Sequence, residues 1–507
     1  MYTHSLNCRS PGSVYCINPE YHPSEQGIKH IYATILPASF KQHKLLTELV
    51  AMNQDIRYNY NTHYLAFPQA LSVRSPQPKM LFSLHRILWI ILLIHFLAGC
   101  AYFKQPSIPH YAPAIQKAAA MRLEARKTEA LENNLAEKAD FFEERIFSTF
   151  KAPQLHIFGE TDYPDKALTI DLEATALMLA TMLAKYQCTQ DAKDLRAIEQ
   201  ILDGLEQLDA LNGLDGFLPY QVNAETLQIT NGRTHSNAYA QIMFAYVLIA
   251  QTIPGSPAHQ KVLEQAARIA QYFIRYEFKM HDAKGLPIEF SNLKPRRWQL
   301  SRSRNLDFLV IAECLRGLLP PNSPHQSELK RHLQEAIRVG YLQKIQTLSF
   351  QFLDIRIPTD GSDWLNMIRL KALTDISSRP EYASAFARLY RKQFKEKNPF
   401  FAILYQDRSQ EATIQHYLDS FPLSLDNQLI LPAACIELKK RPPLIKHSRT
   451  VEAVTPAPIY QRPPSDNMWK NNPFRVHGGN TAPQPVEFSG SDFTLAYWLG
   501  RMYGLVK

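Results

Sequence analysis

The residues best suited to chemistry are carboxylates in the long connections between predicted helices, or in the first turns of the helices that follow. The candidate acids and bases are Asp215, Glu289, Asp307 and Asp363, together with His235. Cleavage of a glycosidic bond needs two carboxyl groups, one protonated to assist the leaving oxygen and one that acts as base or nucleophile. Lyases and epimerases instead need a base beside a cation that stabilises developing negative charge. These residue types allow either chemistry.

Each candidate also has an ordinary structural interpretation. Asp363 stands at a predicted helix start, where a carboxylate can accept backbone N–H bonds as an N-cap. Asp215 belongs to an N-G-L-D-G turn, which an Asx turn also explains. Asp307 borders an apolar stretch, so burial could raise its pKa, or it could pair with Arg304 three residues earlier. His235 stands at a predicted helix terminus, where a hydrogen-bonded structural histidine is equally expected.

Aromatic and cationic side chains in the same connections could bind a ligand. The candidates are Tyr220, Trp298, Arg302, Arg304 and Trp364. Aromatic faces stack on sugar rings, and the planar arginine fork matches carboxylates and phosphates. If the arginine-rich connection around Trp298 lines a cleft, it predicts an anionic ligand such as a uronic acid, a phosphorylated glycan or a lipopolysaccharide core. A solvated loop is the alternative interpretation.

Composition excludes several classes of protein. Apolar residues make up 45% of the chain and charged residues 20%, which is typical of a globular protein. The net charge is +9, but no P-loop or zinc-finger spacing accompanies it, so we expect no nucleic-acid partner. The six cysteines form no CxxC pair and no paired-histidine spacing occurs, so neither a metal nor another cofactor is predicted. Cys314 and Cys435 lie in apolar stretches and are predicted to be small buried hydrophobic residues.

The strongest local signal begins at Met80. A short segment with Arg86 precedes an apolar run from Ile87 to Ala98, and the run closes on the sequence L-A-G-C at Cys100. Such a run is short for a membrane-spanning helix and typical of a secretory signal peptide. The ending resembles the lipobox of bacterial lipoproteins, in which the cysteine is acylated and the chain is cut before it. The resemblance implies a signal peptide over residues 80–99 and a lipid on Cys100.

This resemblance also predicts a location. Ala101 follows the cysteine instead of an aspartate, a pattern that in Gram-negative bacteria resembles sorting to the outer membrane, facing the periplasm or the cell surface. Several acyl chains on one residue anchor a protein stably without a spanning helix. An uncleaved transmembrane helix and a buried helix are the alternatives. Residues 1–79 precede the signal and show no sustained periodicity, so we expect an over-extended start or a disordered extension.

The rest of the chain is predicted to be all-α. After a tether over residues 100–117, residues 118–150 predict a charged helix, either a solvated stalk or a helix packed on the edge of a domain over residues 151–507. Amphipathic helix patterns run through that domain, and no Val/Ile-rich alternating segment competes with them. The patterns cover residues 167–186, 191–211, 236–251, 258–278, 305–319, 326–346, 363–376, 380–396, 411–420, 425–438 and 491–505.

The connections between these helices alternate between short and long. Short turns join helices into antiparallel hairpins. The long connections are residues 212–235, 279–304, 347–361, 397–410 and the Pro-rich segment 439–490. If the hairpins stack side by side, every long connection emerges at the same end of the domain. Because sites are usually built from loops held on a rigid scaffold, we expect the functional site at that end.

Hairpin repetition of this kind resembles the α/α toroid, or six-hairpin glycosidase-like, superfamily of glycoside hydrolases, polysaccharide lyases and sugar epimerases. The resemblance covers roughly residues 164–507. Three stretches add to it: N-G-L-D-G-F-L-P-Y after an early hairpin, S-R-S-R-N-L-D-F at the opening of an inner helix, and S-D-F-T-L-A-Y-W-L-G-R in the last inner helix. The alternative is a helical-repeat solenoid, although solenoids keep a tighter period than these hairpins do.

Two functions follow as expectations. The first is a carbohydrate-active enzyme, glycosidase-like or polysaccharide lyase-like, with Asp363, Asp307 and Asp215 as acids or bases. The second is a non-catalytic envelope lipoprotein that binds a glycan or a protein partner through the same face. A pair of carboxylates about 5–10 Å apart across a cleft would indicate a glycosidase. Carboxylates neutralised by arginine would indicate binding.

Overall fold

The computed structural model describes residues 113–160, 168–297, 301–348, 351–352, 355–356, 360–393, 398–423, 436–437, 458–462, 469, 475–476 and 489–507. All of them belong to one compact unit that begins at Pro106. The apolar run before Cys100, Cys100 itself and Cys435 lie outside the described residues. Within the described part, no helix is both long and apolar enough to cross a membrane.

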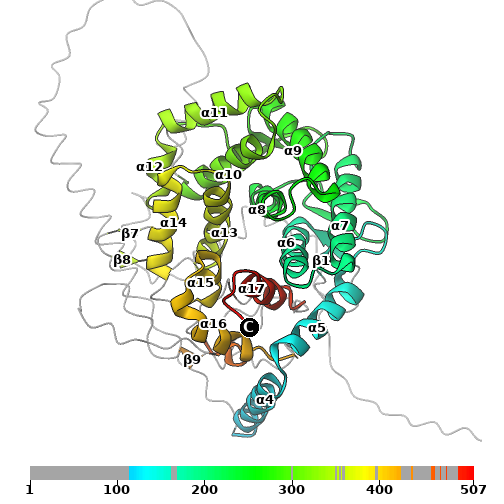
Figure 1. Ribbon diagram of the computed structural model, residues 1–507, viewed down its shortest axis with the longest axis vertical. Helices are drawn as coiled ribbons and strands as arrows, with labels where there is room; N and C mark the ends of the chain where they lie inside the picture. Colours follow the sequence, from blue (N-terminus) through cyan, green and yellow to red (C-terminus); the bar gives the residue numbers. More distant parts are fainter. Residues whose placement is uncertain are drawn as a thin grey trace, which may run out of the picture. The chain divides into compact units, whose positions relative to one another are not determined.

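An inner ring of helices forms the centre of this unit (Figure 1). Its members are α6 (Leu172–Thr189), α8 (Ser236–Thr252), α10 (Arg302–Leu318), α13 (Asp360–Ile376), α15 (Pro399–Tyr405) and α17 (Ser491–Met502). Each packs on the next, and α17 packs on α6, which closes the ring. The longer inner helices are apolar on nearly all sides because neighbours cover them all round, as in α8, whose residues 238–249 are all buried.

Outer helices surround this ring and alternate with the inner ones along the chain (Figure 1). They are α5 (Leu135–Arg145), α7 (Ala192–Ala210), α9 (Pro257–Arg275), α11 (Gln326–Arg338), α12 (Tyr341–Ile345), α14 (Pro380–Gln393) and α16 (Glu411–Asp419). In α9, buried Val262, Ala266, Ile269 and Phe273 recur at helical spacing and face the inner ring. The result is a closed double ring of hairpins, so the predicted all-α toroid is confirmed and the solenoid is excluded.

The predicted charged helix over residues 118–150 is divided into two helices. α4 (Pro113–Glu132) ends before Asn134, which starts α5 as its N-cap and forms a capping box with Glu137. α5 packs on α17, where the Phe142 and Phe493 rings lie 5.2 Å apart. This segment is therefore part of the toroid from α5 onward, and a π-helical turn, η1 (Ile146–Phe150), follows it.

A buried polar contact joins the first and last parts of the ring. Trp498 Nε1 of α17 donates a hydrogen bond to Glu143 Oε1 of α5 at 2.5 Å. Lys185 of α6 pairs with the other oxygen of the same carboxylate and lies 3.6 Å from Asp194 of α7. Burial raises the pKa of Glu143 against the effect of Lys185 and Trp498. Three helices from opposite ends of the domain, α5, α6 and α17, thus meet at one carboxylate.

Short antiparallel strands, which the sequence did not predict, lie in the connections. They are too short to show the period-two alternation that identifies a strand. One sheet contains β1 (Gly159–Glu160), β2 (Thr169–Asp171), β3 (Gln221–Asn223) and β4 (Ile229–Asn231), and three pairs consist of β5 (Lys279–His281) with β6 (Pro287–Asn292), β7 (Gln351–Phe352) with β8 (Ile355–Arg356), and β9 (Ile436–Glu437) with β10 (Arg475–Val476).

Two predictions about helices and loops were wrong. The long loop predicted over residues 397–410 contains the inner helix α15 and the 3-10 turn η3 (Arg408–Gln410). Only seven residues long, α15 is too short for its period to be recognised in the sequence. The helix predicted over residues 425–438 lies mostly outside the described residues, and its described pair, Ile436–Glu437, forms the strand β9. The prediction for Cys314 is confirmed, because that residue is fully buried in α10.

Candidate functional site

Polar side chains from several inner helices meet at the end of the toroid where those helices begin. The connections over residues 211–235 and 276–301 each lead from an outer helix to the N-terminus of the next inner helix. The opposite ends are joined by shorter turns, such as residues 253–256 between α8 and α9. We call the end that carries the long connections and the N-termini of the inner helices the long-loop end. Helix N-termini carry partial positive charge.

A buried ion pair lies at the centre of this end. Arg369 Nη2 of α13 is 2.7 Å from Asp307 Oδ1 of α10, and the two side chains are 2% and 3% exposed. Ser236, the first residue of α8, donates from its hydroxyl to Asp307 Oδ2 at 2.7 Å. Burial raises the pKa of Asp307, although Arg369 and Ser236 act in the opposite direction. The carboxyl group is thus held by two helices and screened from water.

The guanidinium of Arg369 also binds three neutral side chains. Nη2 donates to Asn237 Oδ1 of α8 at 2.5 Å. Nη1 donates to Asn366 Oδ1 in its own helix at 2.9 Å and to Ser303 Oγ of α10 at 3.1 Å. Together with Asp307, these contacts connect α8, α10 and α13 through one buried cation.

A second carboxylate near this pair is Glu173, at the start of α6. The helix itself is capped by Asp171, whose side chain accepts from the backbone N–H groups of Glu173 and Ala174 at 2.7 and 2.9 Å. Glu173 follows in the first turn and is half-buried. Its negative charge lies near enough to Asp307 to raise the pKa of that group further. Glu173 and Asp307 are therefore one candidate acid–base pair at this end.

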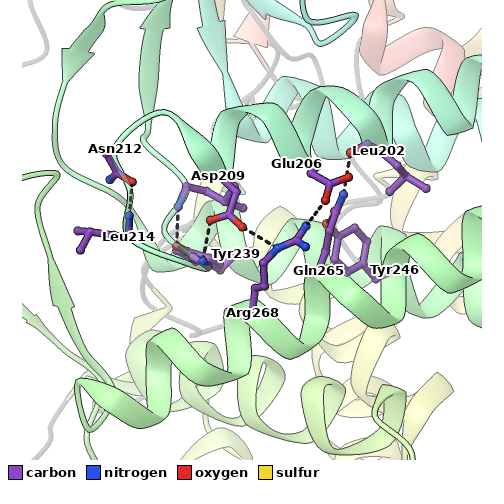
Figure 2. Close-up of polar contacts among 11 residues, drawn as sticks. Leu202, Glu206, Asp209, Asn212, Leu214, Tyr239, Tyr246, Gln265 and Arg268 are labelled. Atoms are coloured by element: carbon purple, nitrogen blue, oxygen red, sulfur yellow. Dashed lines mark hydrogen bonds and ion pairs between the residues drawn. The ribbon is translucent and has the colours of Figure 1, made fainter.

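A separate network fixes the loop that enters α8, and Figure 2 shows its contacts. Asp209 at the end of α7 accepts from Gly216 N at 2.6 Å and from Arg268 Nε at 2.9 Å. The Tyr239 hydroxyl donates to Gly216 O and accepts from Leu218 N, both at 2.9 Å. Gly216 has φ +77, and a Cβ there would lie 2.1 Å from Arg268 O, so only glycine fits. Burial raises the pKa of Asp209 to about 6 against the effect of Arg268.

The structure separates the predicted acids and bases. Asp307 is in the buried network, but it pairs with Arg369 and not with Arg304, which is half-exposed. Asp363 is buried in the first turn of α13, three residues after the helix begins, so it is not the N-cap. Asp215 is exposed, and the Asx turn beside it is made by Asn212, whose Oδ1 accepts from Leu214 N at 3.0 Å.

His235 lies just before α8, is exposed and makes no side-chain cap. Its ring is 4.6 Å from the ring of half-buried Tyr220, so these two predicted residues do come together at the long-loop end. Arg302 begins α10 and is half-exposed at the same end.

Trp364, predicted as a candidate for stacking on a sugar, is not exposed in the structure. Its side chain is fully buried, and its ring lies 6.3 Å from that of Phe400 in α15, so it packs inner helices together. Glu289 lies in β6, but its side chain is outside the described residues, as are Trp298 and Cys100.

Comparisons with known proteins identify neither a family nor a curated relative. No family model matches the chain, and no curated protein matches it. Among solved structures, it is similar to the cellobiose 2-epimerase of Bacillus thermoamylovorans B4167, with 12% identity, 54% of this chain and 72% of that one covered, and a TM-score of 0.34. A sugar epimerase from a ruminal bacterium gives 11% identity, 61% and 83% coverage and a TM-score of 0.34.

A family 76 glycoside hydrolase from a bovine Bacteroides thetaiotaomicron strain gives 14% identity, 60% of this chain and 63% of that one covered, and a TM-score of 0.33. At identities and TM-scores this low, the activities and substrates of these proteins cannot be transferred to this chain. The toroid is established by the packing of the inner and outer helices described above.

Sequence reasoning missed most of the buried network. Ser236, Asn237, Glu173 and the Asn366–Arg369 pair were not among its candidates. One signal could have found the last two, because Asn366 and Arg369 stand at positions i and i+3, on one face, within the apolar stretch 364–370 of α13. Their partners lie far away in the chain, as Asn237 and Arg369 are 132 residues apart, and no local pattern identifies them.

The arrangement has two chemical capacities. The first is recognition, because hydroxyl, amide and guanidinium groups converge where helix N-termini favour negative or hydrogen-bond-accepting groups. The second is proton transfer, because a carboxyl group with a raised pKa lies near a second carboxylate. The contacts of Asp307 favour the first, since both of its carboxyl oxygens already bind protein groups, one Arg369 and the other Ser236.

The first prediction concerns this ion pair. Arg369→Met should lower the free energy of unfolding by about 3–5 kcal/mol, because it leaves the Asp307 carboxyl buried without its partner. Adding Asp307→Leu should recover most of that loss, since two apolar side chains then fill the same space. Urea denaturation at pH 7 measures both variants. Arg338→Met is the control, because Arg338 lies in an exposed pair with Glu335. A loss below about 1 kcal/mol for Arg369→Met would contradict the pairing.

The second prediction concerns pH. The pKa of Asp209 is about 6 in the folded chain, against 3.8 for an aspartate free of the fold, so the folded state binds more protons between these values. The free energy of unfolding should therefore fall as pH rises from about 4 to 6, by up to roughly 3 kcal/mol from this group. In Asp209→Asn this contribution disappears, and the difference between variant and parent measures it. Exposed Asp140→Asn on α5 is the matched control, and identical pH profiles for all three proteins would refute the assignment.

Proposed function

We propose that this chain is a bacterial outer-membrane lipoprotein whose toroid binds a glycan at its long-loop end. The observation that carries the binding part is the buried network around Asp307 and Arg369. Replacing a buried ion pair by apolar side chains is often neutral or stabilising, so stability alone does not account for keeping one. Buried polar groups that converge at one end of a scaffold are typical of a ligand site.

The charges at the rim of this end favour a glycan that carries acidic groups. Arg233 and His235 are exposed, and Arg302 and Arg304 are half-exposed. Two carboxylates nearby already have partners within the protein, since Asp171 caps α6 and Asp307 pairs with Arg369. Arginine binds carboxylate and phosphate groups through parallel hydrogen bonds, which suits acidic sugars of the cell envelope.

A glycosidase-like enzyme is the second candidate function. One observation favours it: Asp307 has a raised pKa, and the Glu173 carboxylate lies near it on α6. That combination suits a protonated acid and an ionised partner. Binding is preferred because Arg369 neutralises Asp307 and because Ser236 also occupies its second oxygen.

Anchoring is supported by the sequence around Cys100. A basic segment, a short apolar run and the L-A-G-C ending follow the order of a lipoprotein signal. Between Cys100 and the start of α4 at Pro113 there is a segment of 12 residues, residues 101–112, which at full extension reaches about 40 Å. Such a tether would hold the toroid close to the lipid surface.

The third prediction tests the anchor. When the full gene is expressed in a Gram-negative host, intact-mass analysis of membrane-extracted protein should show a chain that begins at an acylated Cys100. Cys100→Ser should abolish acylation and accumulate the unprocessed chain, because no thiol remains to accept the diacylglyceryl group. Cys188→Ser is the control and should be processed normally. A chain that begins at Met1 and carries an unmodified Cys100 would overturn the anchoring proposal.

The fourth prediction tests the ligand. The detergent-extracted protein should bind acidic core oligosaccharides released from lipopolysaccharide more tightly than neutral dextran fragments of similar size. Affinity should fall as salt is raised, because rim arginines contact charged groups. Arg302→Ala with Arg304→Ala should lower affinity about tenfold and flatten the salt dependence. Arg331→Ala with Arg338→Ala, on the outer helix α11, is the matched control.

Calorimetry measures binding, and chromatography of the same mixtures detects any cleaved product. Equal affinity for acidic and neutral fragments would contradict the rim assignment. Product release that Asp307→Asn and Glu173→Gln each abolish would establish the glycosidase-like function instead of simple binding.

A further inference from the structure

The face of α8 that points into the inner ring can be identified from its contacts. Tyr239 stacks on Tyr272 of α9 and Tyr246 donates to Gln265 of α9, so this side of α8 faces the outer ring. Asn237 binds Arg369 of α13, which belongs to the inner ring. Successive residues of a helix are turned by about 100°, so Gln241 lies one turn below Asn237 on the same, inward side.

Gln241 is a buried amide without a hydrogen-bond partner. Its residue is 1% exposed, and neither its Nε2 nor its Oε1 atom has a partner in the structure. An unpaired buried polar group costs free energy, and both ends of this amide are unpaired. The fold does not require it, because an apolar side chain of the same length would occupy the same position without that cost.

A second buried glutamine shows the contrast. Gln265 of α9 is 3% exposed, donates to Leu202 O at 2.7 Å and accepts from the Tyr246 hydroxyl. Both ends of that amide are used within the protein, and Figure 2 shows these contacts. Gln265 therefore has a structural function that Gln241 lacks.

The surroundings of Gln241 restrict what could bind it. Above it, Asp307 and Arg369 compensate each other's charge. Below it on the same helical face are Phe244 and Leu248, which are apolar. A charged group placed here would find no compensating charge on this face of α8, whereas a hydroxyl can donate to Oε1 and accept from Nε2. The chemistry matches an uncharged, hydroxyl-bearing part of a ligand.

We propose that Gln241 is a specificity-determining residue whose side-chain amide binds a hydroxyl group on an uncharged part of the glycan. This inference rests on the proposed glycan binding and assigns different chemical groups of the glycan to two parts of the site. The rim arginines recognise acidic groups, and the interior amide recognises hydroxyl groups of the sugar that enters the ring from the long-loop end.

The test uses the full, detergent-extracted protein and two leucine variants. Gln241→Leu should raise the melting temperature of the free protein by about 2 °C or more, since it removes an unpaired buried amide. Gln265→Leu should lower it, because it leaves the Tyr246 hydroxyl and the Leu202 carbonyl without partners. The two variants change the same residue type at similar burial, which isolates the effect of the hydrogen bonds.

Binding of the same acidic core oligosaccharides supplies the second readout. Gln241→Leu should weaken binding about tenfold while the salt dependence of the affinity stays that of the parent, because no ionic contact is lost. The rim variant Arg302→Ala with Arg304→Ala should instead change the salt dependence.

Two results would overturn the inference and leave the proposed function standing. One is parental affinity in Gln241→Leu, and the other is a lower melting temperature for that variant, which would give the amide a structural function. If the parent protein itself binds no oligosaccharide, the proposed function fails, and the inference fails with it.

Discussion

The structure depends on closure of the inner ring, because every inner helix needs a neighbour on both sides to bury its apolar surface. Each inner helix is buried on nearly every side only if both of its neighbours are present. The last neighbour of α6 is α17, which arrives from residues 491–502, more than 300 residues later in the chain. The bonds that Glu143 accepts from Trp498 and Lys185 are therefore made where closure is completed. Because these hydrogen bonds join segments from both ends of the domain, they stabilise the fold only when the ring is closed.

Closure also creates the interior in which polar groups become costly. A side chain that points inward from α8, α10 or α13 meets other helices instead of water. Most buried positions of the inner helices are accordingly apolar, and the buried aspartates Asp307, Asp363 and Asp492 lie in the first two turns of their helices. There, Asp307 gains from the positive ends of the helix dipoles and from the Ser236 hydroxyl, while Arg369 reaches it from a position farther along α13. The buried aspartates thus lie at the end of the ring where the helix dipoles lower the cost of a buried negative charge.

The sequence predicted the toroid because its determinants are local and repeated. Amphipathic patterns such as that of α9 identify outer helices, and short turns identify hairpins. Helix N-caps are local in the same sense: Asp191 stands directly before α7, and its side chain accepts a hydrogen bond from Lys193 N. Features that depend on tertiary contact could not be read. The sequence around Trp364 does not distinguish a buried aromatic from a ligand-binding one, because its burial depends on packing against α15. The helix α15 is itself too short to show a helical period.

The same distinction explains the candidate site. Asp307 could be selected from sequence because a carboxylate beside an apolar helical run is locally unusual. Its partner could not, because the choice between Arg304 at i−3 and Arg369 on another helix is decided by which face of α10 turns inward. Ser303 and Asp307 are four residues apart and share that face, and both contact Arg369. Arg304 is turned by about 100° from Ser303 and stays half-exposed at the rim. The rotation of α10 therefore places Arg369 against the buried Asp307 carboxyl and leaves Arg304 at the rim, and this separation favours the proposed recognition over catalysis.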